Sequence, residues 1–402
     1  MPAAPNPTTT RSATSSQSAR SASSITSGVR LLIWTPEAST PPRGTQRLME
    51  LPNNPNQVGP VCLVTGANGY VGKHLVRRLL ELGCEVRALD LAAFEGDPRV
   101  TSIAGDSPRM SDMGPACEGV DTVFHVAAII NTLTLARPSV REQVYGVNVA
   151  GTECVIRACK AASVKKLIFT SSITVAVDRP IREGDETAPY VGTDGLPDLC
   201  SQTKSKAEKL VLEADDPSGL RTAAVRPGGV WGPGEGAIMV RDFLEHLAAG
   251  QFKVTIGDGT SVTDNVHVDS VVDVHFLVAQ KLTDDPDLVA GEAYFVSDDE
   301  PTNPVVWYRP IVEGLGYSWP KMHIPRPGAY AFAYLGEVAH YFGGPFPTVT
   351  RRGVLSICRD ASFGVDKARA HLGYEPRTSA AEGIPKLMDD FRATHDRFKA
   401  AQ

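Results

Sequence analysis

The sequence predicts an α/β fold in which a doubly wound parallel sheet is followed by a smaller C-terminal lobe. From residue 61 onward, short apolar runs alternate with helical segments, and this alternation is typical of parallel strands joined by right-handed crossovers. After residue 232 the strict alternation fades. We therefore expect an N-terminal extension over residues 1–58, a sheet domain over 59–232, and a lobe over 233–395 that is interleaved with the sheet domain.

The composition is that of an ordinary globular protein. Of the 402 residues, 42% are hydrophobic and 21% are charged, and no run approaches the roughly 20 apolar residues of a membrane-spanning helix. The net charge of −6 provides no basic surface for nucleic acid. Seven cysteines occur without a C-x-x-C pair or a zinc-like spacing. We therefore expect free thiols, no metal site and a reducing, cytoplasmic location.

The first 58 residues form a segment of different character. They are rich in Ser, Thr, Pro and Ala, and such a segment cannot bury enough apolar surface to offset the entropy of ordering it. Three interpretations stay open. Residues 1–48 are an organelle-targeting leader, or they are an over-extended gene start with Met49 as the first residue, or they are a disordered tail.

Hydrophobic periodicity predicts the elements of the sheet domain. The segment 70–82 is expected to be a helix because Val71, Leu75 and Leu79 lie on one helical face. Short apolar runs predict buried strands at 61–65, 85–89, 121–126 and 166–170. A second, longer helical stretch is expected over 139–162.

The turn between the first strand and the first helix predicts a dinucleotide site of the Rossmann type. Gly66, Gly69 and Gly72 have the spacing G-x-x-G-x-x-G. Glycine permits a sharp turn and a close approach of the pyrophosphate to the main chain, and the helix N-terminus adds positive charge. Asp90 ends the second strand, where an acid binds the adenosine ribose hydroxyls. The alternative for Asp90 is a turn or capping residue.

The same acid indicates which cofactor is bound. A carboxylate at Asp90 repels the 2′-phosphate of NADP, so NAD is favoured. Lys73 and Arg87 are nearby cations, but Arg87 falls inside the second strand and is expected to point away. Asp106 follows a third strand, where it either contacts the adenine or caps a loop.

Six motifs extend this interpretation to a family. They are Thr65–Gly72, Asp121–Ala128, Asn148–Thr152, Phe169–Ser172, Arg226–Gly232 and Leu372–Pro376. In this order they resemble the 3β-hydroxysteroid dehydrogenase/isomerase family of extended short-chain dehydrogenases. The resemblance implies an NAD-dependent oxidoreductase acting on the secondary alcohol or ketone of a hydrophobic, steroid-like substrate, with a 3β-hydroxysteroid as the expected type.

The resemblance also implies which residues act on the substrate. The family uses a Ser, a Tyr, and a Lys four residues after the Tyr. By position the Ser is Ser172, with Ser171 as a substitute, and the Lys is Lys204. Cys200 stands where the family has its Tyr. The predicted cofactor-binding residues are Gly66, Asn68, Gly69, Tyr70, Val71, Gly72, Asp90, Asp106, Ala127, Lys204 and Pro227.

The replacement of the Tyr leaves several interpretations open. A thiol has a reference pKa near 8.5, below the phenol's value of about 10, and we expect Lys204 to lower the pKa of Cys200 further. The sulfur lies roughly 4 Å short of a phenolic oxygen, so a bridging water would be needed, because direct proton transfer requires hydrogen-bond distance. Otherwise the Tyr190 side chain turns into the site, or the substrate sits deeper. A catalytically impaired NAD-binding sensor or scaffold is the main alternative, and a lyase or isomerase with a retained cofactor is a third.

The second half of the chain predicts the lobe that selects the substrate. Helices are expected over 237–250 and 271–282, with a strand over 293–296. His267 resembles a family position beside the site, but a structural, hydrogen-bonded His is the favoured interpretation. The aromatic-rich segment 325–346 forms a wall for a flat sterol, a helix packed on the core, or a face resting on a membrane. We expect a small hydrophobic substrate as partner; peripheral membrane contact and a homodimer stay open.

Overall fold

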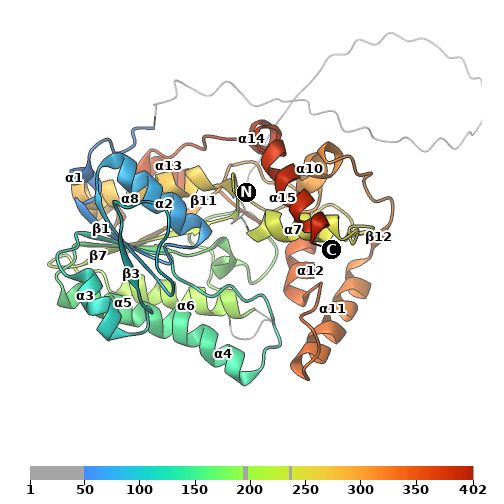
Figure 1. Cartoon of the computed structure of the whole chain (residues 1–402), viewed down its shortest axis with the longest axis horizontal. Helices are drawn as coiled ribbons and strands as arrows, with labels where there is room; N and C mark the ends of the chain where they lie inside the picture. The colour runs from blue at the N-terminus through green and yellow to red at the C-terminus, as the bar shows by residue number, and fades with distance from the viewer. Residues whose placement is uncertain (1–48, 193–197, 235–237, 402) are drawn as a thin grey trace, which may run out of the picture. The chain divides into compact units, whose positions relative to one another are not determined.

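A computed structural model describes residues 49–192, 198–234 and 238–401. A seven-stranded parallel sheet forms the centre of this part of the chain (Figure 1). This confirms the predicted fold class. In spatial order the strands are β11 (Glu292–Val296), β7 (Arg221–Pro227), β5 (Lys166–Thr170), β4 (Thr122–His125), β1 (Val61–Thr65), β2 (Glu85–Asp90) and β3 (Thr101–Ala104).

Helices cover both faces of the sheet because its strands are apolar on both sides. One face carries α1 (Pro55–Val58), α2 (Tyr70–Leu82), α8 (Val268–Asp284), α9 (Pro286–Val289) and α13 (Asp366–Leu372). The other carries α3 (Met110–Cys117), α4 (Pro138–Tyr145), α5 (Gly151–Ala161) and α6 (Leu199–Glu213). Full burial of a side chain such as Leu75 or Leu79 contributes about 1.5–3 kcal/mol.

The order of the strands reverses at β1, and this places the candidate site. β1 lies between β2 and β4, so the connections from β1 and β4 leave the sheet toward opposite faces. In doubly wound sheets ligands bind in the crevice beyond the carboxyl ends of the strands at this point. The loops that follow Thr65, Asp90 and His125 begin at this edge of the sheet.

The long helix expected over 139–162 is interrupted. Between α4 and α5 the residues Gly146–Ala150 form a π-helical turn, and such turns are frequent at functional sites. The side chain of Asn148 in this turn is buried. Its Oδ1 accepts from the Ile129 amide at 2.7 Å, and its Nδ2 donates to the Ile129 carbonyl at 3.0 Å. Periodicity alone does not reveal this extra residue in the turn.

The domain boundary after residue 58 stays a prediction, but described residues just before it pack on the core of the sheet domain. Val58 is fully buried, and Met49 and Leu51 pack against the same core. Asn54 begins α1 by accepting from the Asn56 amide at 3.1 Å. The interpretations given for residues 1–48 concern residues outside the described part of the chain.

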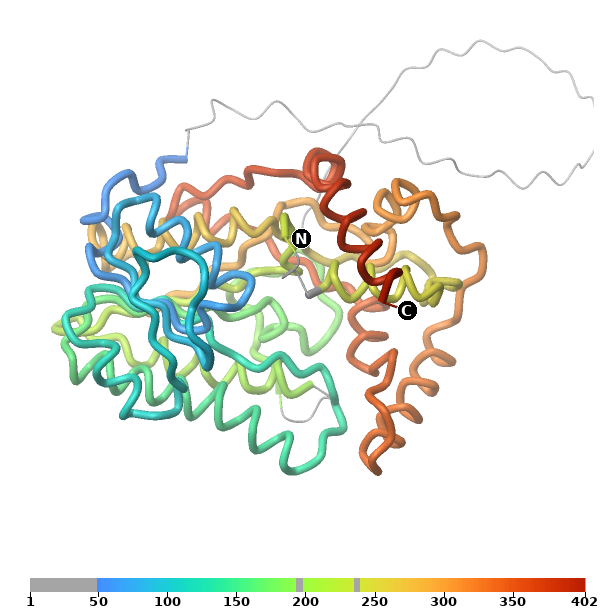
Figure 2. Tube along the Cα trace, in the orientation of Figure 1, coloured from blue at the N-terminus to red at the C-terminus, as the bar shows by residue number. Residues whose placement is uncertain are grey.

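The C-terminal half divides between the sheet and the lobe. β11 and α8 belong to the sheet domain although they follow residue 232; the division at 232/233 itself stays a prediction. The lobe contains α7 (Ile238–Ala248), the 3₁₀ turn Val306–Tyr308, α10 (Arg309–Gly314), α11 (Arg326–Tyr341), α12 (Arg351–Cys358), α14 (Ala380–Lys386) and α15 (Met388–Ala400). The last helix, α15, packs along α7 (Figure 2).

Besides the central sheet, the described residues form three short two-stranded sheets. They pair β8 (Gly229–Trp231) with β10 (Asn265–His267), β9 (Thr255–Ile256) with β12 (His323–Ile324), and β6 (Ile181–Gly184) with β13 (Ala361–Phe363).

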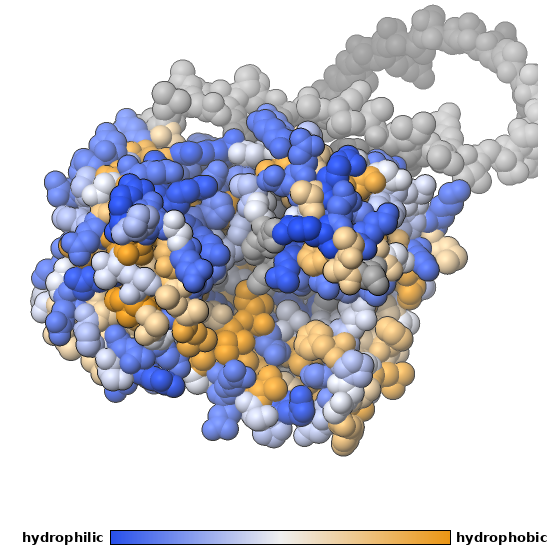
Figure 3. All heavy atoms as spheres, viewed as in Figure 1, coloured by the Kyte–Doolittle hydropathy of each residue, from blue (hydrophilic) through white to orange (hydrophobic). Residues whose placement is uncertain are grey.

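The aromatic segment 325–346 packs on the core along one side only. On α11 the residues Ala329, Ala333 and Glu337 are buried, and Glu337 pairs with Arg351 of α12 at 2.9 Å. Several large apolar side chains are left exposed on its other side (Figure 3); they are Phe332, Tyr334, Leu335, Phe342 and Phe346. Within residues 49–192, 198–234 and 238–401, no helix is long and apolar enough to span a bilayer.

Candidate active site

The glycine turn leaves no room for side chains. Gly66 has φ +69°, and a Cβ there would lie 2.7 Å from the Ala127 amide nitrogen. A Cβ on Gly72 would lie 2.2 Å from the Gly66 carbonyl oxygen, and one on Gly69 would lie 3.1 Å from it. The absence of side chains therefore packs α2 directly against the turn and exposes its first amides, as a pyrophosphate site requires. Tyr70 and Val71 supply the first two residues of α2.

Asp90 lies at this turn as predicted. Its Oδ2 accepts from the Asn68 amide at 2.9 Å, and its Oδ1 accepts from the Leu91 amide at 2.8 Å. These bonds fix the carboxylate at the end of β2 without a cationic partner among them. Arg87 points away, since its guanidinium donates to the carbonyl oxygens of Ala116 and Glu118 at 3.0 and 2.7 Å.

The other predicted cofactor residues are placed less tightly. Asp106 follows β3, and its amide donates to the Asp112 carboxylate at 2.9 Å. Tyr70 donates its hydroxyl to the Pro233 carbonyl at 3.0 Å, and burial raises the pKa of this phenol. Ala127 lies against Gly66 after β4, and Pro227 ends β7 opposite Val296. No hydrogen bond or ion pair joins Asp106 to the turn in the described part of the chain, so its role stays a prediction.

Lys204 is a buried cation on α6. Its ammonium donates to the Thr170 carbonyl at 2.6 Å and lies 4.6 Å from the centre of the Phe169 ring. Burial lowers the pKa of Lys204 to about 8. An ammonium has three donors, and this is the one hydrogen bond that the described residues give it. The remaining donors fit the hydroxyls of a nicotinamide ribose.

The hydroxyl oxygen of Ser172 is held by hydrogen bonds from Thr174. This oxygen accepts from the amide and from the hydroxyl of Thr174 at 3.2 and 3.1 Å, and Ser172 begins the 3₁₀ turn Ile173–Ala176. The proton of Ser172 is therefore available for a substrate oxygen. Ser171 is buried, and its Oγ has no hydrogen-bond partner within the residues described.

The acidity expected for Cys200 is wrong. Cys200 lies one turn before Lys204 and is half-buried, and its amide donates to the Asn131 carbonyl at 3.1 Å. Burial, together with the carboxylate of Asp198, raises the pKa of the Cys200 thiol to about 11. Lys204 lowers this pKa, as predicted, but by less than burial raises it. The thiol is therefore neutral near pH 7.

Tyr190 is engaged elsewhere. Its hydroxyl donates to Glu208 Oε1 at 2.7 Å, and Glu208 lies eight residues after Cys200 on α6. The structure therefore does not bring Tyr190 into the position that the family gives to its Tyr.

Two buried histidines support the strands beneath the site. His125 lies within the motif Asp121–Ala128, whereas no motif pointed to His275. His275 Nδ1 lies 2.7 Å from the Val271 carbonyl, which only accepts, so Nε2 accepts from the Thr170 hydroxyl at 2.8 Å. His125 bonds Thr65 and Thr152 at 2.7 and 3.0 Å. Burial lowers the pKa of His275 to about 4 and that of His125 to about 3.

Asn148 and His267 have structural roles. Asn148 donates to the Thr203 hydroxyl at 2.9 Å and so joins the π turn to α6. The motif Asn148–Thr152 was the feature of the sequence that indicated this residue. His267 begins α8, where its Nδ1 accepts from the Asp269 amide at 3.3 Å. This agrees with the favoured structural interpretation of His267.

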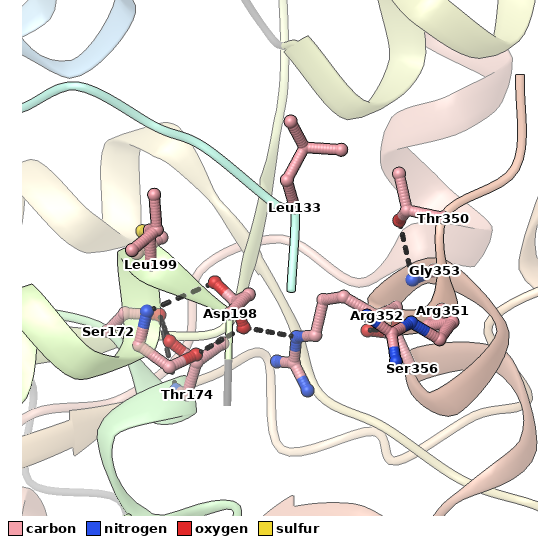
Figure 4. Close-up of polar contacts among 12 residues, drawn as sticks. Leu133, Ser172, Thr174, Asp198, Leu199, Thr350, Arg351, Arg352, Gly353 and Ser356 are labelled. Carbon is pink, nitrogen blue, oxygen red and sulfur yellow. Dashed lines mark hydrogen bonds and ion pairs between the residues drawn. The ribbon is translucent and has the colours of Figure 1, made fainter. Parts of the chain in front are cut away.

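A cavity of about 450 Å³ adjoins α6 on the side of the lobe. Asp198 and Ser201 line it from the first turn of α6, and Arg352 lines it from α12. Asp198 pairs with the Arg352 guanidinium at 3.0 Å (Figure 4). The Asp198 carboxylate also accepts from the amide and the hydroxyl of Ser201 at 3.1 and 2.7 Å.

Known proteins resemble this chain over most of its length. The model of the 3-beta hydroxysteroid dehydrogenase/isomerase family matches residues 63–326. A 3 beta-hydroxysteroid dehydrogenase/Delta 5→4-isomerase from Mycobacterium tuberculosis is 35% identical over 344 residues, which cover 84% of this chain and 92% of that protein. Short-chain dehydrogenase/reductase family 42E member 1 from Danio rerio is 37% identical over 338 residues, covering 80% and 86%.

Solved structures show the same architecture. A dTDP-glucose 4,6-dehydratase from Streptomyces venezuelae, determined with NAD bound, has a TM-score of 0.65 at 20% identity, and the match covers 85% of this chain and all (100%) of that one. At this level of identity the likeness shows the fold alone.

Proposed function

Because the chain belongs to the 3-beta hydroxysteroid dehydrogenase/isomerase family, we propose that it is an NAD-dependent oxidoreductase acting on the secondary alcohol or ketone of a hydrophobic, steroid-like substrate. The observation that carries the proposal is the joint geometry of the glycine turn, Asp90 and Lys204. A Cβ would fill the turn at Gly66 or Gly72, the Asp90 carboxylate is fixed beside it, and Lys204 keeps donors free.

These residues fit NAD. The turn and the N-terminus of α2 would hold the pyrophosphate, Asp90 would accept from the adenosine ribose and disfavour a 2′-phosphate, and Lys204 would donate to the second ribose. When bound, NAD would accept or supply the hydride.

The residues of the chain then orient the substrate and move its proton. Ser172 donates its hydroxyl proton to the reacting oxygen of the substrate. Cys200 exchanges a proton with that oxygen through one bridging water, because the thiol is too short for direct contact. Lys204 stabilises the thiolate that forms when the thiol gives up its proton.

One specific observation favours the second candidate, a catalytically impaired NAD-binding protein used as a sensor or scaffold. The pKa of Cys200 is raised to about 11 by burial, so at neutral pH few molecules contain the thiolate that alcohol oxidation needs. The high pKa of Cys200 is less of an obstacle to ketone reduction, because the neutral thiol is the proton donor in that direction.

Turnover separates the two candidates, because both bind NAD. Purified protein is mixed with NAD and a panel of 3β-hydroxysteroids, and reduced nicotinamide is followed by its absorbance. Turnover that is abolished by Lys204→Ala supports the proposal, with Lys206→Ala as the matched control on the exposed side of the same helix. NAD binding without cofactor reduction on steroid, sugar-nucleotide and β-hydroxy-acid panels favours the second candidate. Product formed without net cofactor reduction indicates a lyase or isomerase.

A further inference from the structure

Three guanidinium groups converge on the cavity beside α6. Arg326 lies at the start of α11, Arg352 lies on α12, and Arg359 directly follows α12; all three line the cavity of about 450 Å³. They come from the lobe, whereas the opposite wall includes the first turn of α6 and thus the residues next to Cys200. The cavity is therefore next to the candidate active site.

Of the two aspartates in the described lining, only Asp198 forms an ion pair with one of these cations. Asp198 is paired with Arg352 at 3.0 Å. The Arg359 guanidinium donates to the backbone carbonyl oxygen of Asp178 at 3.5 Å, and the structure gives it no ion pair with the Asp178 carboxylate. Within residues 49–192, 198–234 and 238–401, neither Arg326 nor Arg359 has a carboxylate within ion-pair distance. Among the described residues the lining contains three Arg and two Asp, and these side chains together carry a charge of +1.

Such an arrangement costs free energy when no anion is present. Like charges in a partly desolvated space repel each other because the medium screens them less than water does. Burial lowers the pKa of Arg359, and the charges of Arg326 and Arg352 lower it further, while Tyr330 and Asp178 oppose this by less. The three guanidinium groups that line the cavity therefore lie close enough to repel each other. A bound oxyanion would remove this repulsion. Arginine forks are also suited to bidentate bonds with sulfate, phosphate or carboxylate.

We propose that this cavity binds an anionic group on the substrate, a sulfate or phosphate ester or a carboxylate, at the end remote from the reacting hydroxyl. The proposal rests on the proposed function and adds a substrate class to it. Arg326 and Arg359 provide the two unpaired guanidiniums, while Arg352 stays with Asp198. The ring of Tyr330 and the side chain of Leu355 also line the cavity, and they offer apolar contact to the hydrocarbon that bears the charge.

The test compares a 3β-hydroxysteroid that carries a sulfate ester on its far ring with its uncharged parent. We expect kcat/KM for the conjugate to exceed that for the parent by tenfold or more, because a hydrogen bond to a charged group is worth roughly 10- to 100-fold in affinity. Arg326→Gln and Arg359→Gln are each expected to lower this ratio by about tenfold. Lys321→Gln, an exposed cation of the same lobe outside the lining, is expected to leave the ratio unchanged.

The outcomes separate this proposal from the proposed function. If parent and conjugate turn over equally in all four proteins, the anion site is wrong and the oxidoreductase stands. If neither turns over, binding of the conjugate is measured by calorimetry. Binding that both Arg variants weaken keeps the anion site and rejects the oxidoreductase, whereas absence of binding overturns the anion site as well. Inorganic sulfate is tested in the same way. If it alters turnover of the parent steroid in a manner that depends on the same arginines, and the conjugate is not preferred, the cavity binds a free anion. That result overturns the assignment of the anion to the substrate.

Discussion

The Tyr190 hydroxyl donates to Glu208 Oε1 at 2.7 Å. Glu208 is fully buried and also accepts from the Arg226 guanidinium at 2.6 Å. Two cations lie near the Tyr190 ring, with Lys209 4.5 Å and Arg226 5.3 Å from its centre. Moving Tyr190 toward Cys200 would break this network and leave a buried carboxylate with one partner fewer, so Tyr190 supports α6 and does not replace the missing phenol.

Tyr190→Phe tests this role. The variant loses a hydrogen bond to a charged group, so we expect the free energy of unfolding to fall by about 1.5–3 kcal/mol. Turnover of a 3β-hydroxysteroid at a temperature where the variant is folded should change no more than a few-fold. Denaturant unfolding and steady-state kinetics measure the two effects. A hundredfold loss of turnover in the folded variant would mean that Tyr190 does take part in proton transfer.

Asp90→Ala is expected to reduce the preference for NAD. Removing the carboxylate removes the repulsion of a 2′-phosphate and the acceptor for the ribose hydroxyls. The ratio of Kd values for NADP and NAD should therefore fall by about tenfold, since one charged interaction is worth that much. Asp97→Ala is the matched control, since Asp97 is a partly exposed loop acid that pairs with Arg99 at 2.6 Å. An unchanged ratio in Asp90→Ala would contradict the role given to this residue.

The rate of alcohol oxidation should depend on pH in two stages. The reaction requires the Cys200 thiolate and the Lys204 ammonium, and their pKa values are about 11, raised by burial, and about 8, lowered by burial. Below pH 8 the thiolate fraction rises about tenfold per pH unit while the ammonium stays intact. Above pH 8 the loss of ammonium offsets the gain of thiolate, so the rate levels off.

Cys200→Ser controls for this titration, because a serine hydroxyl does not ionise in the range measured. We expect its pH–rate profile to lack the rise between pH 6 and 8. A wild-type rate that falls over this interval would show that the thiol is not the proton acceptor.

His275 is expected to make the protein sensitive to acid. Burial lowers its folded-state pKa to about 4, below the unfolded value of about 6.5, so the unfolded chain binds the extra proton first. Stability from this group is therefore present above pH 6.5 and falls as the pH decreases toward 4. Between pH 7 and 5 the loss is about 2 kcal/mol.

His275→Gln should remove this part of the pH dependence. Comparing unfolding free energies of the two proteins at pH 7 and pH 5 isolates the His275 contribution, because the other titrating groups are common to both. Equal pH dependence in the two proteins would show that His275 is not buried in its neutral form.

Local patterns predicted the sheet and the glycine turn because the chemistry that fixes them lies within short stretches of sequence. The helix Tyr70–Leu82 has the predicted bounds, since its apolar face and its glycine cap at Gly83 adjoin in sequence. Asp90 could be placed for the same reason, because it simply ends the strand that follows.

Features that depend on distant residues could not be predicted. The sign of the Cys200 pKa shift depends on burial by elements that fold around it, which spacing does not report. Arg352 meets Asp198 across 154 positions of sequence, and the cluster with Arg326 and Arg359 forms only when α11 and α12 pack against the sheet domain. The π turn at Gly146–Ala150 adds one residue to a helix without changing its composition.

We propose that the residues that would bind NAD are all present, whereas proton transfer is limited by the short side chain and the high pKa of Cys200. The most direct measurement is kcat/KM of Cys200→Tyr with NAD and a 3β-hydroxysteroid, together with the Kd for NAD. A phenol four residues before Lys204 restores direct proton transfer, so we predict a rise in kcat/KM of about 10²–10⁴-fold with unchanged affinity for NAD. Unchanged or lower kcat/KM in a folded, NAD-binding variant would contradict the account.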